Sequence, residues 1–224
     1  MFRGLLLGAA LCLYFVDADR LDFTAVFKQG FGGVFLWIIW ISLVLDMLYR
    51  LIPNRRITIG ARKHYSCSYS AASESNDTSE SLKGLHKGAL SSAIFWLAVS
   101  GTILFVLFSF NMLTPAAVLI VMLVYGLCDL IFILFFCPFQ KLFMGNRCCT
   151  VCRIYNWDYF MMCAPLILFP GIYSLSLVLL SAAVLLRWEI ALGKNPRFFI
   201  RETNGNLSCE ACKDRLCKMK IAGK

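Results

Sequence analysis

PAAVLIVMLVYGLCDLIFILFF, residues 115–136, is the stretch that decides the fold. It is predominantly apolar, and Asp129 is its one charged residue. An α-helix needs about 20 apolar residues to cross the roughly 30 Å hydrocarbon core of a bilayer. This stretch has that length, and Pro115 suits the first turn of a helix, where a backbone N–H has no partner within the helix. The sequence therefore predicts a transmembrane helix here.

Five further apolar stretches accompany this helix. Residues 33–52, 89–110 and 172–192 are of similar length, whereas 5–16 and 157–169 are shorter and would have to thin the bilayer or enter it partway. Hydrophobic residues make up 59% of the chain and charged residues 16%, against about 25% charged in an ordinary soluble domain. We therefore predict an all-α, polytopic membrane protein with about six transmembrane helices over residues 1–192, followed by a short cytosolic tail at 193–224.

The start of the chain also has features of a secretory signal, with an early charge and a short apolar region. Residues 15–19, FVDAD, contain no small-residue cleavage site, so we expect 5–16 to be retained as a first span.

The distribution of basic residues predicts the topology. Most of the 22 Lys and Arg residues follow the second, fourth and sixth predicted spans, whereas the turns 111–114 and 170–171 carry no charge. Loops rich in Lys and Arg stay in the cytoplasm. With six spans both termini are predicted to be cytosolic; if 5–16 does not cross, only the N-terminus changes side.

Seven of the eleven cysteines form two clusters, which this topology places on the same side of the membrane. CPFQKLFMGNRCCTVCR, residues 137–153, carries the first cluster, and SCEACKDRLCK, residues 208–218, carries the second. Disulfides are rare in a reducing cytoplasm, and a C-x2-C pair can direct two thiolates at one ion. A hairpin between the clusters would bring two such pairs together. The predicted metal ligands are Cys149, Cys152, Cys209 and Cys212, with Cys148, Cys217 and Cys137 as additional thiols.

Zinc is the favoured metal, because it commonly closes four-cysteine structural sites, and an iron–sulfur cluster is the alternative. Unliganded cysteines on a cytosolic surface are the simpler interpretation of the same pattern. The cysteines within apolar runs, Cys12, Cys128 and Cys163, are expected to serve packing.

Asp129 is the clearest polar candidate inside a span, since a charged group in the hydrocarbon region is costly and is a functional candidate by default. Tyr125 lies one helical turn before it and could donate a hydrogen bond to it. The sequence leaves two roles open for Asp129, a proton or ion pathway and a helix-packing hydrogen bond.

Other charged residues in or near the spans are expected to form ordinary ion pairs. Asp46 has Arg50 four residues later on the same predicted helix, and Arg187 could pair with Asp158 across the last hairpin.

Tryptophans and histidines have simple expected roles. Trp157 and Trp188 are expected to anchor spans at the membrane interface. His64 and His86 lack metal-ligand spacing and are expected to be solvated loop residues.

Two strings, CPFQKLFMGNRCCTVCRIYNWDYFMM at 137–162 and NLSCEACKDRLC at 206–217, give the chain a family resemblance. It resembles a group of bacterial multi-pass membrane proteins with similar cysteine strings, for which no activity is established. The resemblance implies a location in a bacterial cytoplasmic membrane and adds no function.

Three functions follow from these features as competing hypotheses. The first is a helix bundle clamped by a zinc site, which would contact the lipid bilayer and dock a cytosolic protein partner. The second is a membrane redox protein whose iron–sulfur cluster passes electrons to a quinone-like acceptor, and the third is a transporter of metal or another small solute that uses Asp129. The net charge of +9 is explained by topology and does not point to nucleic acid. The sequence identifies no catalytic residue, so enzymatic activity stays open.

Overall fold

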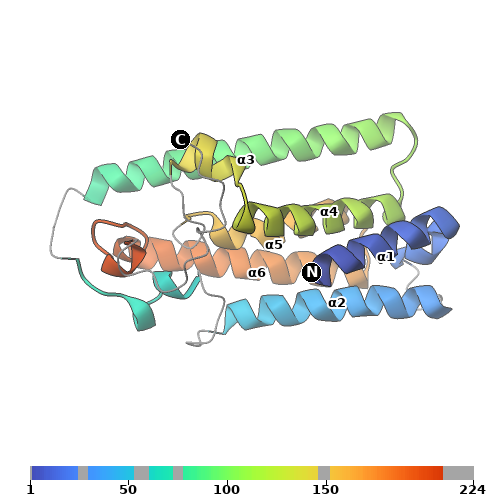
Figure 1. Cartoon of the computed structure of the whole chain (residues 1–224), viewed down its shortest axis with the longest axis horizontal. Helices are drawn as coiled ribbons and strands as arrows, with labels where there is room; N and C mark the ends of the chain where they lie inside the picture. Colours follow the sequence, from blue (N-terminus) through green and yellow to red (C-terminus); the bar gives the residue numbers. More distant parts are fainter. Residues whose placement is uncertain (1, 25–29, 53–60, 73–77, 146–151, 209–224) are drawn as a thin grey trace. The chain divides into compact units, whose positions relative to one another are not determined.

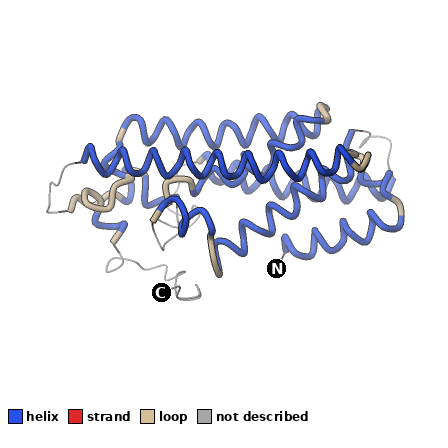
Figure 2. The backbone as a smooth tube through the Cα atoms, turned by 90° about the horizontal axis from the view of Figure 1, so that it is seen from above, coloured by secondary structure: helices blue, strands red, loops and turns tan. Residues whose placement is uncertain are grey.

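The computed structural model describes residues 2–24, 30–52, 61–72, 78–145 and 152–208. The α-helices in these residues are α1 (Phe2–Val16), α2 (Gly30–Leu51), α3 (Thr78–Ser109), α4 (Pro115–Leu134), α5 (Asp158–Cys163) and α6 (Ile172–Lys194) (Figure 1). Figure 2 shows helices and loops without a strand in the part of the chain that is described, where Ala71 and Asn204 form an isolated antiparallel bridge. The predicted all-α fold is confirmed for these residues.

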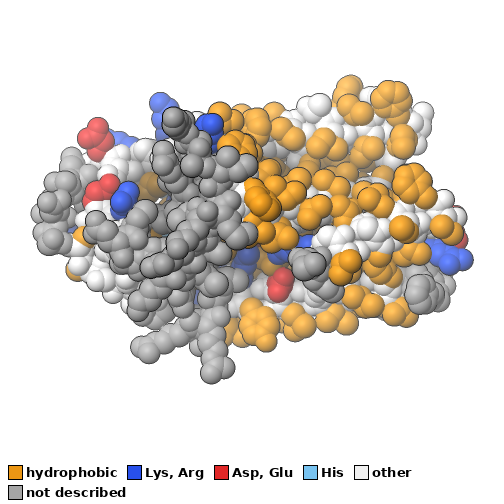
Figure 3. All heavy atoms as spheres, in the orientation of Figure 1, with side chains coloured by type: hydrophobic (Ala, Val, Ile, Leu, Met, Phe, Trp, Pro, Cys, Tyr) orange, Lys and Arg blue, Asp and Glu red, His pale blue; other side chains and the backbone are white. Residues whose placement is uncertain are grey.

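Four described helices are long and apolar enough to cross a membrane, namely Gly33–Leu51 within α2, Ser79–Ser109 within α3, and all of α4 and α6. They confirm the predicted helices at 33–52, 89–110, 115–136 and 172–192. Helix α3 begins earlier than the prediction, because the polar segment before Ala89 continues the same helix. Hydrophobic side chains cover much of the visible surface of these helices on the right of Figure 3.

The two shorter predicted spans do not form membrane-length helices. Helix α1 has 15 residues, which corresponds to about 22 Å at 1.5 Å per residue. The predicted span 157–169 is divided into α5, with 6 residues, and a 3-10 helix at Ala164–Leu168. Pro165 explains the division, because proline has no N–H and its ring clashes with the carbonyl four residues earlier. The count of six crossings therefore stays a prediction.

In the connection between α3 and α4, particular residues end the first helix and begin the second. Asn111 adopts a left-handed conformation with φ of 55°, which asparagine tolerates better than most residues. Thr114 then caps α4, since its Oγ1 accepts a hydrogen bond from the Ala117 N–H at 3.2 Å. Pro115 occupies the first helical position, as predicted.

The described structure divides into two compact units, which are treated separately below. Unit 1 comprises Met1–Tyr49, Trp96–Asp129 and Asp158–Val184, and unit 2 comprises Arg50–Phe95, Leu130–Trp157 and Leu185–Lys224. Helices α2, α3, α4 and α6 each contribute residues to both units.

Unit 1 is held together by side chains from α2 and α6. The Tyr173 hydroxyl donates to the Leu36 carbonyl at 3.0 Å, and the Trp40 Nε1 donates to Ser176 Oγ at 2.9 Å. Phe23 stacks on Tyr173, with ring centroids 5.6 Å apart. The fully buried side chains of this core include Leu36, Ile39, Leu119, Met122, Leu166 and Leu177.

Unit 2 has an aromatic core around Trp188, which is fully buried with Leu192 and Phe199. His64 packs between two of these rings, with centroids 4.9 Å from Trp188 and 4.7 Å from Phe199. Two expectations are therefore wrong: Trp188 is a core residue and not an interface anchor, and His64 is buried and not a solvated loop residue.

The segment 196–208 is fixed within unit 2 by hydrogen bonds that it donates to backbone carbonyls of residues 63–72. Asn204 is fully buried, and its Nδ2 donates to the carbonyls of Lys63 and Phe198 at 2.9 Å each. The Gly205 N–H donates to the Ser70 carbonyl at 2.8 Å, and the Asn206 side chain donates to the Ser68 carbonyl. The chain is thus anchored up to Ser208, immediately before Cys209.

Candidate functional site

Arg3 is the centre of a charged cluster in unit 1. Its Nη1 donates to Asp129 Oδ2 at 3.0 Å and to the Gly126 carbonyl at 3.2 Å, while its Nη2 donates to the Tyr159 hydroxyl at 3.2 Å. The second carboxylate, Asp46, lies 3.9 Å from Arg3 Nη2. Because a guanidinium presents its donors in a fixed planar fork, one arginine can hold α1 against residues of α4 and α5 together.

Each group in this cluster is positioned by a different helix. Arg3 lies in the first turn of α1, Asp46 in the second half of α2 and Tyr159 in α5. Gly126 and Asp129 are three residues apart on α4, so the carbonyl of one and the carboxylate of the other lie on the same face of that helix. The cluster therefore depends on tertiary packing, not on one local motif.

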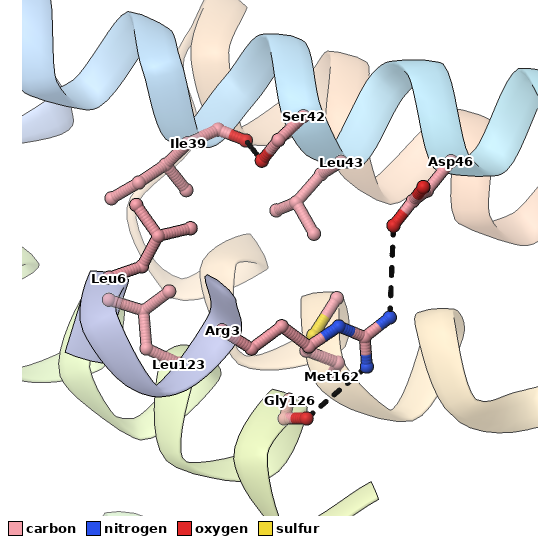
Figure 4. Close-up of a pocket in the computed structure, with 9 residues that line it drawn as sticks. All are labelled: Arg3, Leu6, Ile39, Ser42, Leu43, Asp46, Leu123, Gly126 and Met162. Carbon is pink, nitrogen blue, oxygen red and sulfur yellow. Dashed lines mark hydrogen bonds and ion pairs between the residues drawn. The ribbon is translucent and has the colours of Figure 1, made fainter. Parts of the chain in front are cut away.

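A small cavity of about 30 Å³ adjoins the charged cluster (Figure 4). Its polar lining comes from Arg3, Ser42, Asp46 and Gly126, and its apolar lining from Leu6, Ile39, Leu43, Leu123 and Met162. Figure 4 shows Arg3 reaching from α1 toward Asp46 on one side and toward Gly126 on the other. The lack of a side chain at Gly126 leaves room here, since a Cβ atom would lie 3.0 Å from Met162 Sδ.

The predicted environment of Asp129 is wrong in one respect. Tyr125 does not donate to Asp129, because its hydroxyl shares a 2.8 Å hydrogen bond with Ser100 on α3. Arg3 occupies the place that was expected for Tyr125. Little in the sequence could have pointed to Arg3, because it stands before a short apolar stretch and is 126 residues away from Asp129.

Within their own units, the residues of the other predicted ion pairs contact residues other than the predicted partners, while the pair of Arg187 with Asp158 would join the two units and stays a prediction. Asp46 lies near Arg3, whereas Arg50 donates to Asn156 at 3.0 Å and lies over the Tyr155 ring. Arg187 lies over the Tyr65 ring, 5.5 Å from its centroid. Spacing along one helix could not predict these contacts, because each joins residues that are distant in the sequence.

Most of the predicted metal ligands cannot be placed. Cys148, Cys149, Cys209, Cys212 and Cys217 lie outside the described residues. Cys152 is described and buried, in a cluster with Ala89 and Ile154, and Cys137 is half-buried just after α4. Within the described ranges, no group of three or more His, Cys, Asp or Glu side chains could hold a metal ion.

Arg153, the residue after Cys152, is held firmly in unit 2. Its guanidinium forms a bidentate ion pair with Glu189, with Nη1 to Oε1 at 2.8 Å, and its carbonyl accepts from Trp188 Nε1 at 2.7 Å. Trp157 also donates to Glu189 Oε1, at 2.7 Å. Arg153 is 3% exposed, so this pair fixes the chain next to the first cysteine cluster against α6.

The chain segments beside the two cysteine clusters pack on one core. Tyr155 and Trp157, just after the first cluster, and Phe198 and Phe199, before the second, all belong to the aromatic core around Trp188. These four residues lie in unit 2, so the described flanks of both clusters share one packed environment.

Comparisons with protein-family models, curated proteins and solved structures gave no match to this chain. Its function must therefore be inferred from its own residues and their contacts.

Proposed function

We propose that this chain is an integral membrane protein with a cysteine-thiolate zinc centre on its cytosolic face. The ligands are Cys149, Cys152, Cys209 and Cys212, and the centre clamps the ends of the helix bundle and offers a docking point to a cytosolic protein. Cys137, Cys148 and Cys217 supply the remaining thiols at this face.

The shared aromatic core of unit 2 is the observation that supports the proposal most. Trp188 donates to the carbonyl of Arg153, directly after Cys152, and packs against Phe199. Cys209 follows Ser208, the last residue of the anchored segment, and a chain spans at most about 3.5 Å per residue. Short tethers from a common core therefore favour one shared site over two separate ones.

The chemistry of the sequence around these cysteines also favours thiolates. Arg147, Lys213 and Arg215 adjoin the predicted ligands, and nearby positive charge stabilises the thiolate form that binds metal. Four thiolates around one zinc carry a net charge of about −2, which basic neighbours partly compensate.

Metal analysis of the full chain tests the shared site. We expect about one zinc per chain in the wild type, and loss of zinc in both Cys149→Ser and Cys212→Ser, because each variant removes one of four ligands. Cys12→Ser is the matched control, since Cys12 is an exposed thiol on α1 and should leave the zinc content unchanged. Unchanged zinc in both ligand variants would refute the shared site, and iron with sulfide in place of zinc would identify the iron–sulfur alternative.

The topology is part of the same proposal, since the reducing compartment excludes disulfides between these cysteines. Six membrane segments with both termini in the cytoplasm predict that a reporter fused after Lys224 is active in the cytoplasm. Activity of that reporter only outside the cytoplasm would refute both the orientation and the compartment argument.

A further inference from the structure

Helix α3 is longer than a bilayer crossing requires. It has 32 residues and measures about 48 Å at 1.5 Å per residue, whereas the hydrocarbon core of a bilayer is about 30 Å thick. Residues 90–109 carry no charged side chain and are long enough to cross that core. The charged residues of α3 all lie before Leu90, so we expect residues 78–89 to lie among the lipid headgroups and beyond them.

Within unit 2, one exposed face of α3 changes from lysine to apolar side chains. Lys83 and Lys87 are exposed, and the exposed Leu90 and Ile94 follow them at helical spacing on the same face. Lys87 lies about 4.5 Å beyond Leu90 along the helix axis, within the roughly 5–7 Å that headgroups add on each side of the core. Lys83 lies about one turn further out, and its flexible stem can bring its ammonium group back toward the headgroups.

A second segment of unit 2 makes the same change beside α3. Phe136, just after α4, is exposed, and the exposed Lys141 places its ammonium nitrogen 5.7 Å from the centroid of the Phe136 ring. The two segments pack closely, since a Cβ atom at Gly88 would lie 2.7 Å from the Phe143 carbonyl oxygen (Figure 1). Lys87 and Lys141 are therefore each within two residues of this contact.

The three lysines keep their charge available for a ligand. Among the described residues, Lys83, Lys87 and Lys141 form no ion pair with a carboxylate, whereas the exposed Arg20 of unit 1 is paired with Asp17 at 2.9 Å. Exposed ammonium groups next to exposed apolar side chains complement an anionic phospholipid, in which a phosphate adjoins acyl chains in the same order.

We propose that Lys83, Lys87 and Lys141 bind the phosphate of an anionic phospholipid at the membrane surface of unit 2, with its acyl chains along the exposed apolar side chains of α3. Lysine suits this role, because its ammonium group is a compact charge on a flexible stem. The site goes beyond the proposed zinc centre and does not depend on it, because no cysteine takes part.

Titration of the full chain with lipid tests the site. The protein in detergent is titrated with phosphatidylglycerol or with zwitterionic phosphatidylcholine of the same acyl chains, and native mass spectrometry gives the Kd of the first bound lipid. We expect the wild type to bind phosphatidylglycerol more tightly. Lys83→Gln, Lys87→Gln and Lys141→Gln should each weaken that binding by about fivefold, the factor that one lysine contributes near an anionic headgroup, and leave phosphatidylcholine binding unchanged.

Arg20→Gln is the control, because it removes an exposed cation that is already paired, and it should bind phosphatidylglycerol as the wild type does. Lys87→Arg keeps the charge and should keep most of the binding. Glycerol phosphate carries the headgroup charge without acyl chains and should not compete at equal concentration. Equal Kd values for the two lipids in the wild type, unchanged binding in all three glutamine variants, an equal loss in Arg20→Gln, or displacement by glycerol phosphate overturns the proposal.

Discussion

Each unit contains a partly or fully buried arginine beside a carboxylate, and the two arrangements differ in balance. In unit 2, Arg153 is 3% exposed and faces one carboxylate, Glu189, in a bidentate pair; Trp157 also donates to Glu189, and Trp188 donates to the Arg153 backbone carbonyl. In unit 1, Arg3 is 26% exposed and faces two carboxylates, one of them beyond hydrogen-bond distance and next to a cavity.

The difference is between an arginine matched to one carboxylate and an arginine shared by two carboxylates. In unit 2 the buried guanidinium of Arg153 is matched by one carboxylate, and removing that carboxylate leaves an uncompensated buried charge. In unit 1 the two carboxylates can compete for the same guanidinium, so the loss of either one costs less. The following substitutions sharpen or break this distinction, from the largest expected effect to the smallest.

Removal of Glu189 should have the largest effect. Glu189→Ala leaves the buried guanidinium of Arg153 without its carboxylate, and we expect a loss of about 3–5 kcal/mol in the free energy of unfolding. Reversible unfolding in mixed detergent micelles measures this loss. The double variant Arg153→Met with Glu189→Leu is the control, because it removes both charges and should recover most of the stability. A loss below about 1 kcal/mol in Glu189→Ala, as at exposed pairs, would place the pair at the surface.

Gly88 of unit 2 and Gly126 of unit 1 offer a second comparison. A Cβ at Gly88 would lie 2.7 Å from the Phe143 carbonyl oxygen, which is backbone, whereas a Cβ at Gly126 would meet the flexible end of Met162. We expect Gly88→Ala to destabilise the protein by about 1–3 kcal/mol, as overpacking does, and Gly126→Ala by less.

Gly84→Ala is the matched control for Gly88→Ala on the same helix, α3. A Cβ at Gly84 meets nothing within 4 Å, so alanine should stabilise the helix by about 0.5–1 kcal/mol through its higher helix propensity. Equal effects of the two α3 substitutions on unfolding would contradict the close approach of residues 140–144 to Gly88.

The long helices could be predicted from the sequence because hydrocarbon thickness sets their length. The apolar runs at 33–52, 115–136 and 172–192 agree with described helices to within a few residues. The conformation of the run at 157–169 was harder to predict. Its composition is equally apolar, but Pro165 prevents a continuous α-helix. Apolar composition alone therefore does not predict whether a segment forms one continuous helix.

The candidate sites were less predictable because their contacts join distant residues. Asp129 could be selected from its cost in an apolar helix, but its partner Arg3 is 126 residues away in the sequence. His64 and Trp188 looked like surface residues because the aromatic core of unit 2 is assembled from three separate segments. The cysteine pairs were recognised by spacing alone, and five of the seven lie outside the described residues, so the ligand set stays a prediction.

A double-mutant cycle on Arg3 and Asp129 gives the sharpest test of the comparison between the units. We expect a coupling free energy of roughly 1 kcal/mol between Arg3→Gln and Asp129→Asn, because both side chains are about one quarter exposed and Asp46 can partly replace Asp129 as the partner of Arg3. The same cycle in an Asp46→Asn background should give a larger coupling, since Asp46 then no longer competes with Asp129 for Arg3. Coupling that is unchanged by Asp46→Asn would mean that Asp46 does not compete with Asp129 for Arg3.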